Sequence, residues 1–186
     1  MNNYVNINKA AWEARTETHL RSEFYALAGF MRGESSLPSL DFELLGDLRG
    51  KSLLHLQCHF GMDTLSIARA GGLQRIVGVD FSKPAIEKAR ELNAKLKLNA
   101  EFIQSNIYQL PEVLQGRFDI VYTSYGVLSW LESLMDWGEL IERFLKPGGR
   151  FVMVEFHPIL WMLDEDLRHI QYPYSRREPY IETGGT

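Results

Sequence analysis

The stretch KSLLHLQCHFGMDTLSIARAGGLQRIVGVD, residues 51–80, decides the fold of this chain. Residues 52–56 and 75–79 are short, mostly apolar runs, which is typical of parallel strands buried on both faces. Asp63 is placed to cap a helix over residues 64–70, which two glycines then end. The stretch therefore predicts a strand, a tight turn, a helix and a second strand.

The rest of the chain continues this alternation. Residues 8–31 are expected to form an N-terminal helix, because apolar residues recur at roughly helical spacing. Further strands are expected at residues 101–103, 118–122 and 151–156, with helices from 83 to about 93 and from 134 to 144. Strands that alternate with helices predict a doubly wound, Rossmann-like parallel sheet with the strand order 3-2-1-4-5.

Length and composition limit the possible functions. The chain has 186 residues, which suits a single domain, and a net charge of −4, which argues against a protein that grips nucleic acid by its phosphates. Its single cysteine, Cys58, cannot form an internal disulfide or a cysteine zinc site. The N-terminus does not resemble a secretory signal, and no apolar run is long enough to span a bilayer. We expect a cytoplasmic protein with a small-molecule partner, no nucleic acid and no membrane association.

Ligands of such sheets bind beyond the carboxyl ends of the strands. Asp80 ends the second strand, where an acid can accept both hydroxyls of a ribose and the neighbouring Phe81 can stack beside an adenine. Asp80 can also be read as a plain helix-entry residue. Gln57 and His59 occupy positions where a dinucleotide site needs glycines. They obstruct a pyrophosphate, so S-adenosyl-L-methionine, which has no phosphates, fits better.

Four segments together resemble the class I S-adenosylmethionine-dependent methyltransferase family. They are LLHLQCHFG at 53–61, VGVDFS at 77–82, FDIVY at 118–122 and LKPGGRF at 145–151. Each segment alone is weak, but they stand in family order and cover about a hundred residues, from Lys51 to His157. The resemblance implies methyl transfer from S-adenosylmethionine on a Rossmann-like fold.

The resemblance also implies roles for single residues. Gly61 would let the loop backbone approach the methionine part of the cofactor, and Asp80 would bind the ribose. The adenine would meet the Asn106 side chain and the Ile107 N–H. Two residues after the fourth strand, Ser124 and Tyr125, would face the transferred methyl group.

The first loop departs from the family pattern. His55 replaces an acid, and Gln57 and His59 replace two glycines. We expect a sub-branch of the family in which both histidines hydrogen-bond the loop and Gln57 helps to hold the amino-acid end of the cofactor. Two histidines without a placed third ligand make a poor metal site, so no metal is expected.

Methyl transfer needs a base only when the acceptor must lose a proton. His157, after the fifth strand, is the candidate base, and Tyr125 is the candidate for orienting the acceptor. A strand-end histidine bonded to the backbone and a packing tyrosine are the alternatives. Tyr4, Trp12 and His19 can line an acceptor pocket or simply pack on the sheet.

The expected organisation is a helical cap at 1–50, a cofactor-binding core at 51–157 and a tail at 158–186, within one domain. The resemblance implies two further strands in an antiparallel hairpin, for which no clear pair follows Phe156. An exposed sheet edge makes a homodimer a hypothesis. The leading interpretation is a small-molecule methyltransferase. The alternatives are a non-catalytic binding or regulatory protein with this fold and an NAD-dependent reductase.

Overall fold

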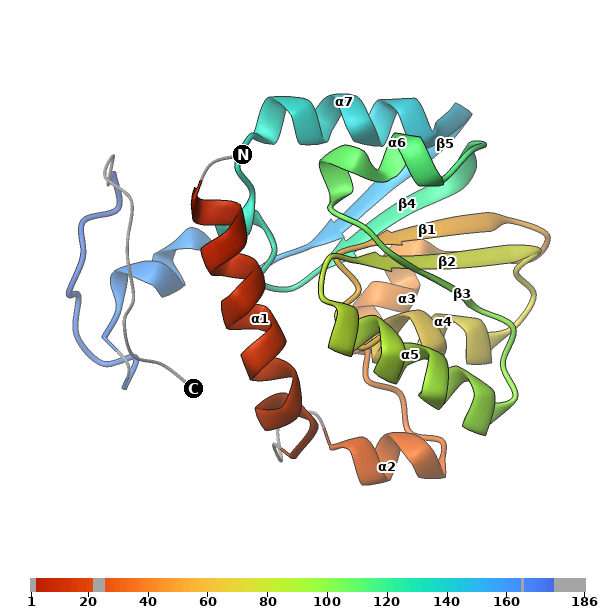
Figure 1. Cartoon of the computed structure of the whole chain (residues 1–186), viewed down its shortest axis with the longest axis horizontal. Coiled ribbons are helices and arrows are strands. Elements are labelled where there is room, and N and C mark those ends of the chain that lie inside the picture. Colours follow the sequence, from red (N-terminus) through yellow and green to blue (C-terminus); the bar gives the residue numbers. More distant parts are fainter. Residues whose placement is uncertain (1–2, 22–25, 165, 176–186) are drawn as a thin grey trace.

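The computed structural model describes residues 3–21, 26–164 and 166–175. Its centre is a sheet of five parallel strands in the order β3-β2-β1-β4-β5, as the sequence predicted (Figure 1). The strands are β1 (Ser52–Leu56), β2 (Arg75–Asp80), β3 (Glu101–Gln104), β4 (Phe118–Ser124) and β5 (Leu145–Val154). In the centre of the sheet, Leu54 is in register with Val77 on one side and Val121 on the other.

Helices cover both faces of the sheet (Figure 1). One face carries α3 (Ser39–Leu45), α4 (Met62–Ala70) and α5 (Lys83–Leu96), and the other carries α6 (Leu110–Val113) and α7 (Leu134–Phe144). The helix α1 (Asn3–Arg21) stands beside the sheet and packs against α5, and α2 (Leu27–Arg32) follows it. Single 3-10 turns are η2 (Ile107–Gln109), η3 (Leu128–Trp130) and η4 (Pro158–Met162).

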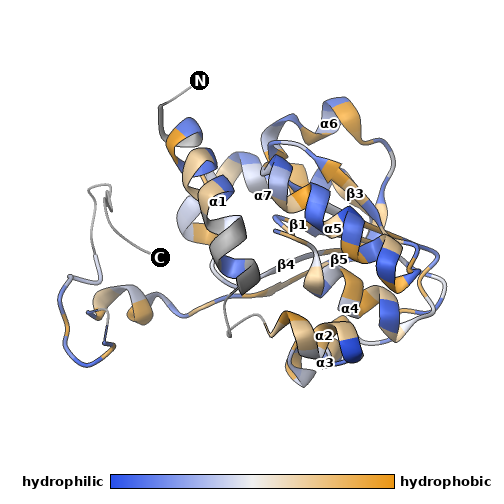
Figure 2. Ribbon diagram, turned by 60° about the horizontal axis from the view of Figure 1, so that its bottom comes forward, coloured by the Kyte–Doolittle hydropathy of each residue, from blue (hydrophilic) through white to orange (hydrophobic). Residues whose placement is uncertain are grey.

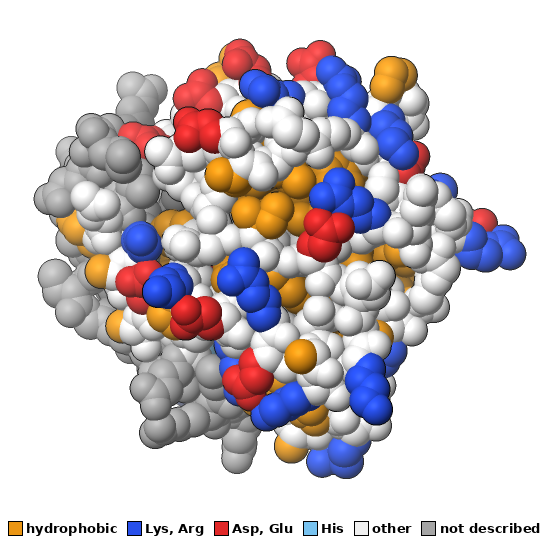
Figure 3. Space-filling model, turned by 45° about the vertical axis from the view of Figure 1, so that its right-hand side comes forward, with side chains coloured by type: hydrophobic (Ala, Val, Ile, Leu, Met, Phe, Trp, Pro, Cys, Tyr) orange, Lys and Arg blue, Asp and Glu red, His pale blue; other side chains and the backbone are white. Residues whose placement is uncertain are grey.

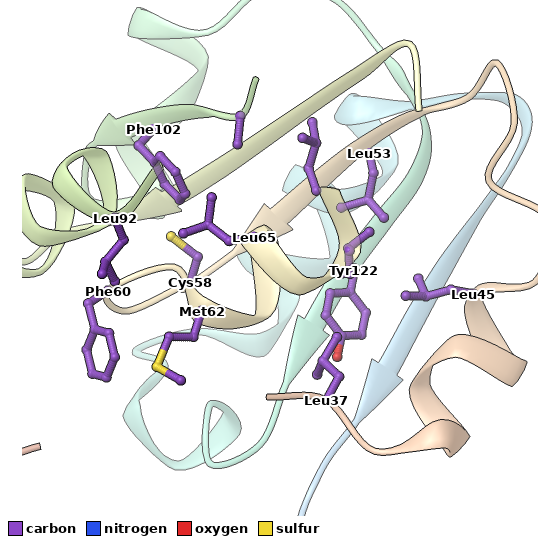
Figure 4. Packing of buried hydrophobic residues seen from close by; sticks show 14 of the residues in the cluster. Leu37, Leu45, Leu53, Cys58, Phe60, Met62, Leu65, Leu92, Phe102 and Tyr122 are labelled. Carbon is purple, nitrogen blue, oxygen red and sulfur yellow. The ribbon is translucent and has the colours of Figure 1, made fainter. Parts of the chain in front are cut away.

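The two faces of the sheet form two hydrophobic clusters, because successive strand residues point to opposite sides. Leu53 belongs to the cluster under α4 and α5, whereas Leu54 belongs to the cluster under α7. Figure 2 shows apolar residues along the strands and polar ones on the outer side of α5. Figure 4 shows the first cluster, where the Tyr122 ring points away from β4 toward Leu37 and Leu45. The N-terminal segment is therefore part of the core.

Two local predictions were wrong. The single helix expected over 8–31 begins earlier, at Asn3, and a separate helix starts at Leu27 after Ala26, whose φ of 43° is left-handed and does not continue a right-handed helix. Asp63 does not cap α4, because that helix begins at Met62 and its N-cap is Gly61. Ser82 does cap α5, as predicted, since its side chain accepts a hydrogen bond from the Ala85 N–H.

The turn at residues 146–149 loops out of the pairing between β4 and β5. Leu145 is in register with Phe118 and Arg150 with Ile120, so four residues are accommodated opposite one. The Lys146 ammonium lies 2.8 Å from Asp119 Oδ2, and the same carboxylate oxygen accepts the Ser52 N–H and hydroxyl. These contacts lower the pKa of Asp119. This turn lies away from the carboxyl ends of the strands.

The described surface has mixed charge on the face shown in Figure 3, where Lys and Arg side chains alternate with Asp and Glu. Within the residues described, no helix is both long and apolar enough to cross a membrane. After β5, the described chain makes η4 and one antiparallel bridge between Leu163 and Ile170. Across residues 158–164 and 166–175 there is no further strand.

Candidate functional site

A cavity of about 770 Å³ lies at the carboxyl edge of the sheet. Its volume falls within the roughly 300–1,000 Å³ that is typical of small-molecule sites. Residues from the turns after β1, β2, β3 and β4 line it, together with residues of α1 and of the segment 34–38. The predicted site residues that line it are Gln57, His59, Gly61, Asp80, Phe81, Asn106, Ile107, Ser124 and Tyr125. The described lining does not include His55 or His157.

The loop after β1 has a left-handed backbone at two residues that are not glycine. Gln57 and His59 both have a φ of 51°, and Gly61 has a φ of 77°. For residues with a Cβ, the left-handed region costs roughly 1–2 kcal/mol each. A Cβ on Gly61 would lie 2.6 Å from the Phe102 ring, so only glycine fits there. The loop thus takes its conformation at a cost in backbone strain.

Asp80 holds this loop against the start of α5. Its carboxylate accepts the His59 N–H at 2.8 Å and the Ser82 N–H at 2.9 Å, and only 6% of the residue is exposed. Burial raises its pKa to about 6, and the backbone hydrogen bonds oppose that rise. A carboxylate has about four lone-pair sites, so these bonds leave acceptor capacity for a ligand in the cavity.

Gln57 offers a second polar group to the cavity. Its Oε1 atom is buried and has no hydrogen-bond partner among the described residues. An unpaired buried carbonyl costs about 1–3 kcal/mol, which a bound donor would recover. Asn106 uses its Oδ1 to accept the Tyr108 N–H at the start of η2. Its amide group remains a donor on the cavity wall.

His55 lies in the sheet beneath the cavity and is 1% exposed. Its Nδ1 lies 2.8 Å from the Thr64 hydroxyl and its Nε2 lies 3.3 Å from the Ser124 hydroxyl. Burial lowers its pKa to about 3, so the ring is neutral at pH 7. In the parts of the chain that the structure describes, no group of three or more His, Cys, Asp and Glu side chains is arranged to hold a metal ion.

Asp63 is a cavity residue that the sequence reading assigned to helix capping. Its carboxylate accepts the Ser36 hydroxyl at 2.7 Å and the Ser124 hydroxyl at 3.0 Å. Because Ser124 gives its proton to Asp63, the neutral His55 ring donates from Nε2 to Ser124 and accepts from Thr64. Burial raises the pKa of Asp63. A chain of hydrogen bonds from the sheet core therefore fixes this carboxylate at the cavity wall.

A second carboxylate, Asp41 of α3, is fully buried behind Tyr125. It accepts the Tyr122 hydroxyl at 2.6 Å and the Tyr125 hydroxyl at 2.8 Å. Burial and the neighbouring carboxylate raise the pKa of both tyrosines, so both stay protonated. No pattern around Asp41 in the sequence announces this role, because its partners lie more than eighty residues away.

The turn after β4 is held by Glu155, which directly follows β5. The Glu155 carboxylate accepts the backbone N–H groups of Gly126, Val127 and Leu128. This clamp holds Tyr125 at a φ of 25°, outside the regions that side chains usually adopt. His157 is exposed and starts η4, where its Nδ1 accepts the Ile159 N–H. The structure thus places His157 at a helix cap.

Aromatic rings close the cavity on the side of α1. The Trp12 ring lies 5.2 Å from the His59 ring and 5.5 Å from the Trp130 ring, and the His19 ring lies 5.2 Å from the His59 ring. Burial, with a smaller contribution from His19, lowers the pKa of His59 to about 3. The side chain of Tyr4 lies outside the described residues. The helix α1 therefore contributes rings to the site through Trp12 and His19.

Comparison with known proteins agrees with this geometry. A family model described as a methyltransferase domain matches residues 48–174. An uncharacterized methyltransferase of Synechocystis sp. is 32% identical over 135 residues, which are 70% of this chain and 59% of that protein. A demethylmenaquinone methyltransferase of Thermus thermophilus is 36% identical over 90 residues, 48% of this chain and 40% of that protein. The chain spans about half the length of these relatives.

A solved structure shares the arrangement of strands and helices. The S-adenosylmethionine dependent methyltransferase from Mesorhizobium loti superposes with a TM-score of 0.57 at 25% identity, over 72% of this chain and 59% of that one. The sheet order, the cavity at its carboxyl edge and the family match over residues 48–174 agree with one another. The chain therefore belongs to the class I S-adenosylmethionine-dependent methyltransferase family.

Proposed function

We propose that this protein transfers a methyl group from S-adenosyl-L-methionine to a small-molecule acceptor. The observation that carries the proposal is the buried Asp80 carboxylate, which lines a cavity of about 770 Å³ beside a turn with a left-handed backbone. An acid at the end of the second strand of such a sheet is suited to ribose hydroxyls. The names of the relatives, among them demethylmenaquinone methyltransferases, support a small acceptor.

The residues present fit the cofactor. Asp80 would accept the ribose hydroxyls, and Phe81 would lie beside the adenine. The Asn106 amide and the Ile107 N–H would meet polar atoms of the ring. The orphaned Gln57 Oε1 would accept from the ammonium of the amino-acid end, while Gly61 lets the backbone come close.

When bound, S-adenosylmethionine supplies a methyl group on a positively charged sulfur, which leaves as a neutral thioether. The chain then has to align the acceptor and exclude water. The rings of Trp12, Trp130 and Tyr125 line the cavity and would exclude water. The Tyr125 hydroxyl donates to Asp41 and stays protonated, so it orients an acceptor by packing and by its free lone pair.

Asp63 takes the role of proton acceptor in this proposal. Its carboxylate lies on the cavity wall, and burial raises its pKa toward the range useful for a general base. Two hydroxyl donors fix its direction. We assign no proton transfer to His157, because its Nδ1 is used at the start of η4.

Two measurements test the proposal. Calorimetry with S-adenosylhomocysteine is expected to show saturable binding at one site, and a methyl-transfer assay with a panel of phenols, quinols and amines is expected to find turnover. Absence of heat on folded protein would overturn the proposal. Binding without turnover on any acceptor would favour the non-catalytic alternative, and saturable binding of NAD in place of S-adenosylhomocysteine would favour a reductase.

A further inference from the structure

The acceptor side of the cavity has a distinct chemical character. We define the acceptor side by six of the lining residues outside the cofactor assignment: Trp12, Asp63, Tyr125, Trp130, Phe156 and Trp161. Five of these six side chains are aromatic. The Tyr125 and Phe156 rings lie 5.5 Å apart, as do the rings of Trp12 and Trp130. Flat rings on two sides favour a flat, apolar ligand that can stack or pack edge-to-face.

The charge of the lining is one-sided. Glu34, Asp63, Asp80 and Glu132 line the cavity, and no Lys or Arg side chain does so among the described residues. Two described cations are already bonded to residues of the lining, and one of them offsets the charge of Glu34. Arg32 pairs with the Glu34 carboxylate at 3.2 Å, and Arg69 donates to the carbonyl oxygens of Phe30 and Glu34. Among the described side chains of the lining, a ligand anion would therefore find no Lys or Arg as a counter-ion.

Asp63 places part of this negative charge on the acceptor side of the cavity. Its carboxylate is fixed by the hydroxyls of Ser36 and Ser124, so it cannot turn away from a bound anion. Asp41 adds a fully buried carboxylate behind Tyr125. Stripping water from an anion beside these groups is costly, whereas a hydroxyl or an ammonium can donate to Asp63.

We propose that the acceptor is a flat, apolar molecule carrying a hydroxyl or amine and no negative charge, and that carboxylates and phosphates are excluded. This proposal rests on the proposed function, because it concerns the acceptor of the same site. It adds the class of acceptor, which neither the family nor the cofactor determines.

The test compares three ligands that share one ring system. Calorimetry measures 2-naphthol, 2-(aminomethyl)naphthalene and 2-naphthoate at pH 7.5, each with saturating S-adenosylhomocysteine and without it. The neutral and cationic ligands are expected to bind at least tenfold more tightly than the anion. Equal or tighter binding of 2-naphthoate would overturn the proposal, and so would failure of all three to bind protein that binds S-adenosylhomocysteine.

Variants separate charge from shape. Asp63→Asn is expected to reduce the ratio of the affinities for 2-naphthol and 2-naphthoate at least threefold. The control Asp47→Asn removes an exposed carboxylate that is paired with Arg49, and it is expected to leave this ratio unchanged. Trp12→Ala is expected to weaken all three ligands alike. An unchanged preference in Asp63→Asn would refute the charge argument. If S-adenosylhomocysteine does not bind but the three naphthalene ligands keep the expected order of affinities, the proposed methyl transfer is wrong. The proposed ligand preference of the cavity is then retained.

Discussion

The cofactor side of the cavity is built from short turns that follow β1, β2 and β3, whereas the acceptor side is assembled from segments far apart in the chain. On the cofactor side, the Asp80 carboxylate accepts the N–H of His59, which lies 21 residues earlier in the chain. On the acceptor side, Ser124 reaches back 61 residues to Asp63, and Tyr125 reaches back 84 residues to Asp41. The first side is built within the consecutive elements from β1 to the turn after β3. The second depends on how the N-terminal segment docks.

The largest expected effect falls on the cofactor side. Asp80→Ala is expected to weaken binding of S-adenosylhomocysteine about a hundredfold, roughly 2.7 kcal/mol, because two ribose hydroxyls lose a charged acceptor. Calorimetry measures this change, with Asp47→Ala as the control for an exposed carboxylate. An unchanged dissociation constant would refute the ribose assignment.

The next effect concerns His55, which is buried beneath the cavity between Thr64 and Ser124. Its pKa is about 3 in the folded protein and about 6.5 when unfolded, so the unfolded chain binds the proton more tightly between these values. The free energy of unfolding therefore decreases as the pH falls below about 6.5, and it goes on decreasing until the pH reaches about 3. Between pH 6.5 and 5 this histidine is expected to cost about 2 kcal/mol.

Urea unfolding at pH 7 and pH 5 measures the contribution of His55. The variant His55→Gln, which cannot be protonated, is expected to lose less stability than the parent over this interval. His59 has a similarly lowered pKa, and Asp80, with its raised pKa, acts in the opposite direction, so the comparison must be made against the parent chain. Identical losses in parent and variant would show that His55 is not the titrating group.

A third prediction tests whether the two sides are independent. Asp41→Asn keeps the shape of the side chain but replaces one charged acceptor of the two tyrosine hydroxyls. Methyl transfer is expected to slow about tenfold, equivalent to about 1.4 kcal/mol, because Tyr125 is held less firmly. The dissociation constant of S-adenosylhomocysteine is expected to stay within twofold. A parallel loss of cofactor binding would mean that the two sides cannot be separated.

The smallest expected effect lies in the loop after β1. Gln57→Gly relieves a left-handed residue and removes an orphaned oxygen, but it also adds freedom to the unfolded chain. The net change in the free energy of unfolding is expected to stay within about 1 kcal/mol. Binding of S-adenosylhomocysteine is expected to weaken about threefold as one hydrogen bond is lost. Tighter binding in the variant would contradict the proposed contact with the amino-acid end.

This contrast explains what could be predicted from the sequence. The sheet order and the positions of Asp80, Gly61 and Asn106 at its edge follow from local patterns, because each lies at the end of a predicted strand or in the turn that follows one. The left-handed backbone at Gln57 and His59 was not predicted, since a positive φ is uncommon for any residue other than glycine.

The acceptor side of the cavity could not be predicted from local sequence patterns. Asp63 stood where a helix cap was expected, and only the folded chain brings Ser36 and Ser124 to its carboxylate. Asp41 had no motif, because its partners are two tyrosines on and just after β4. Long-range pairing of this kind depends on the three-dimensional docking of α3, which no short window of sequence contains.

The contact between Asp41 and Tyr122 also constrains the order in which parts of the fold can form during synthesis. The two residues are 81 positions apart, and Asp41 leaves the ribosome first. Until β4 has been made, this carboxylate has neither tyrosine partner and must stay in water, so α3 cannot take its final place. The acceptor side is therefore completed late, after the strand that carries Tyr122 has joined the sheet.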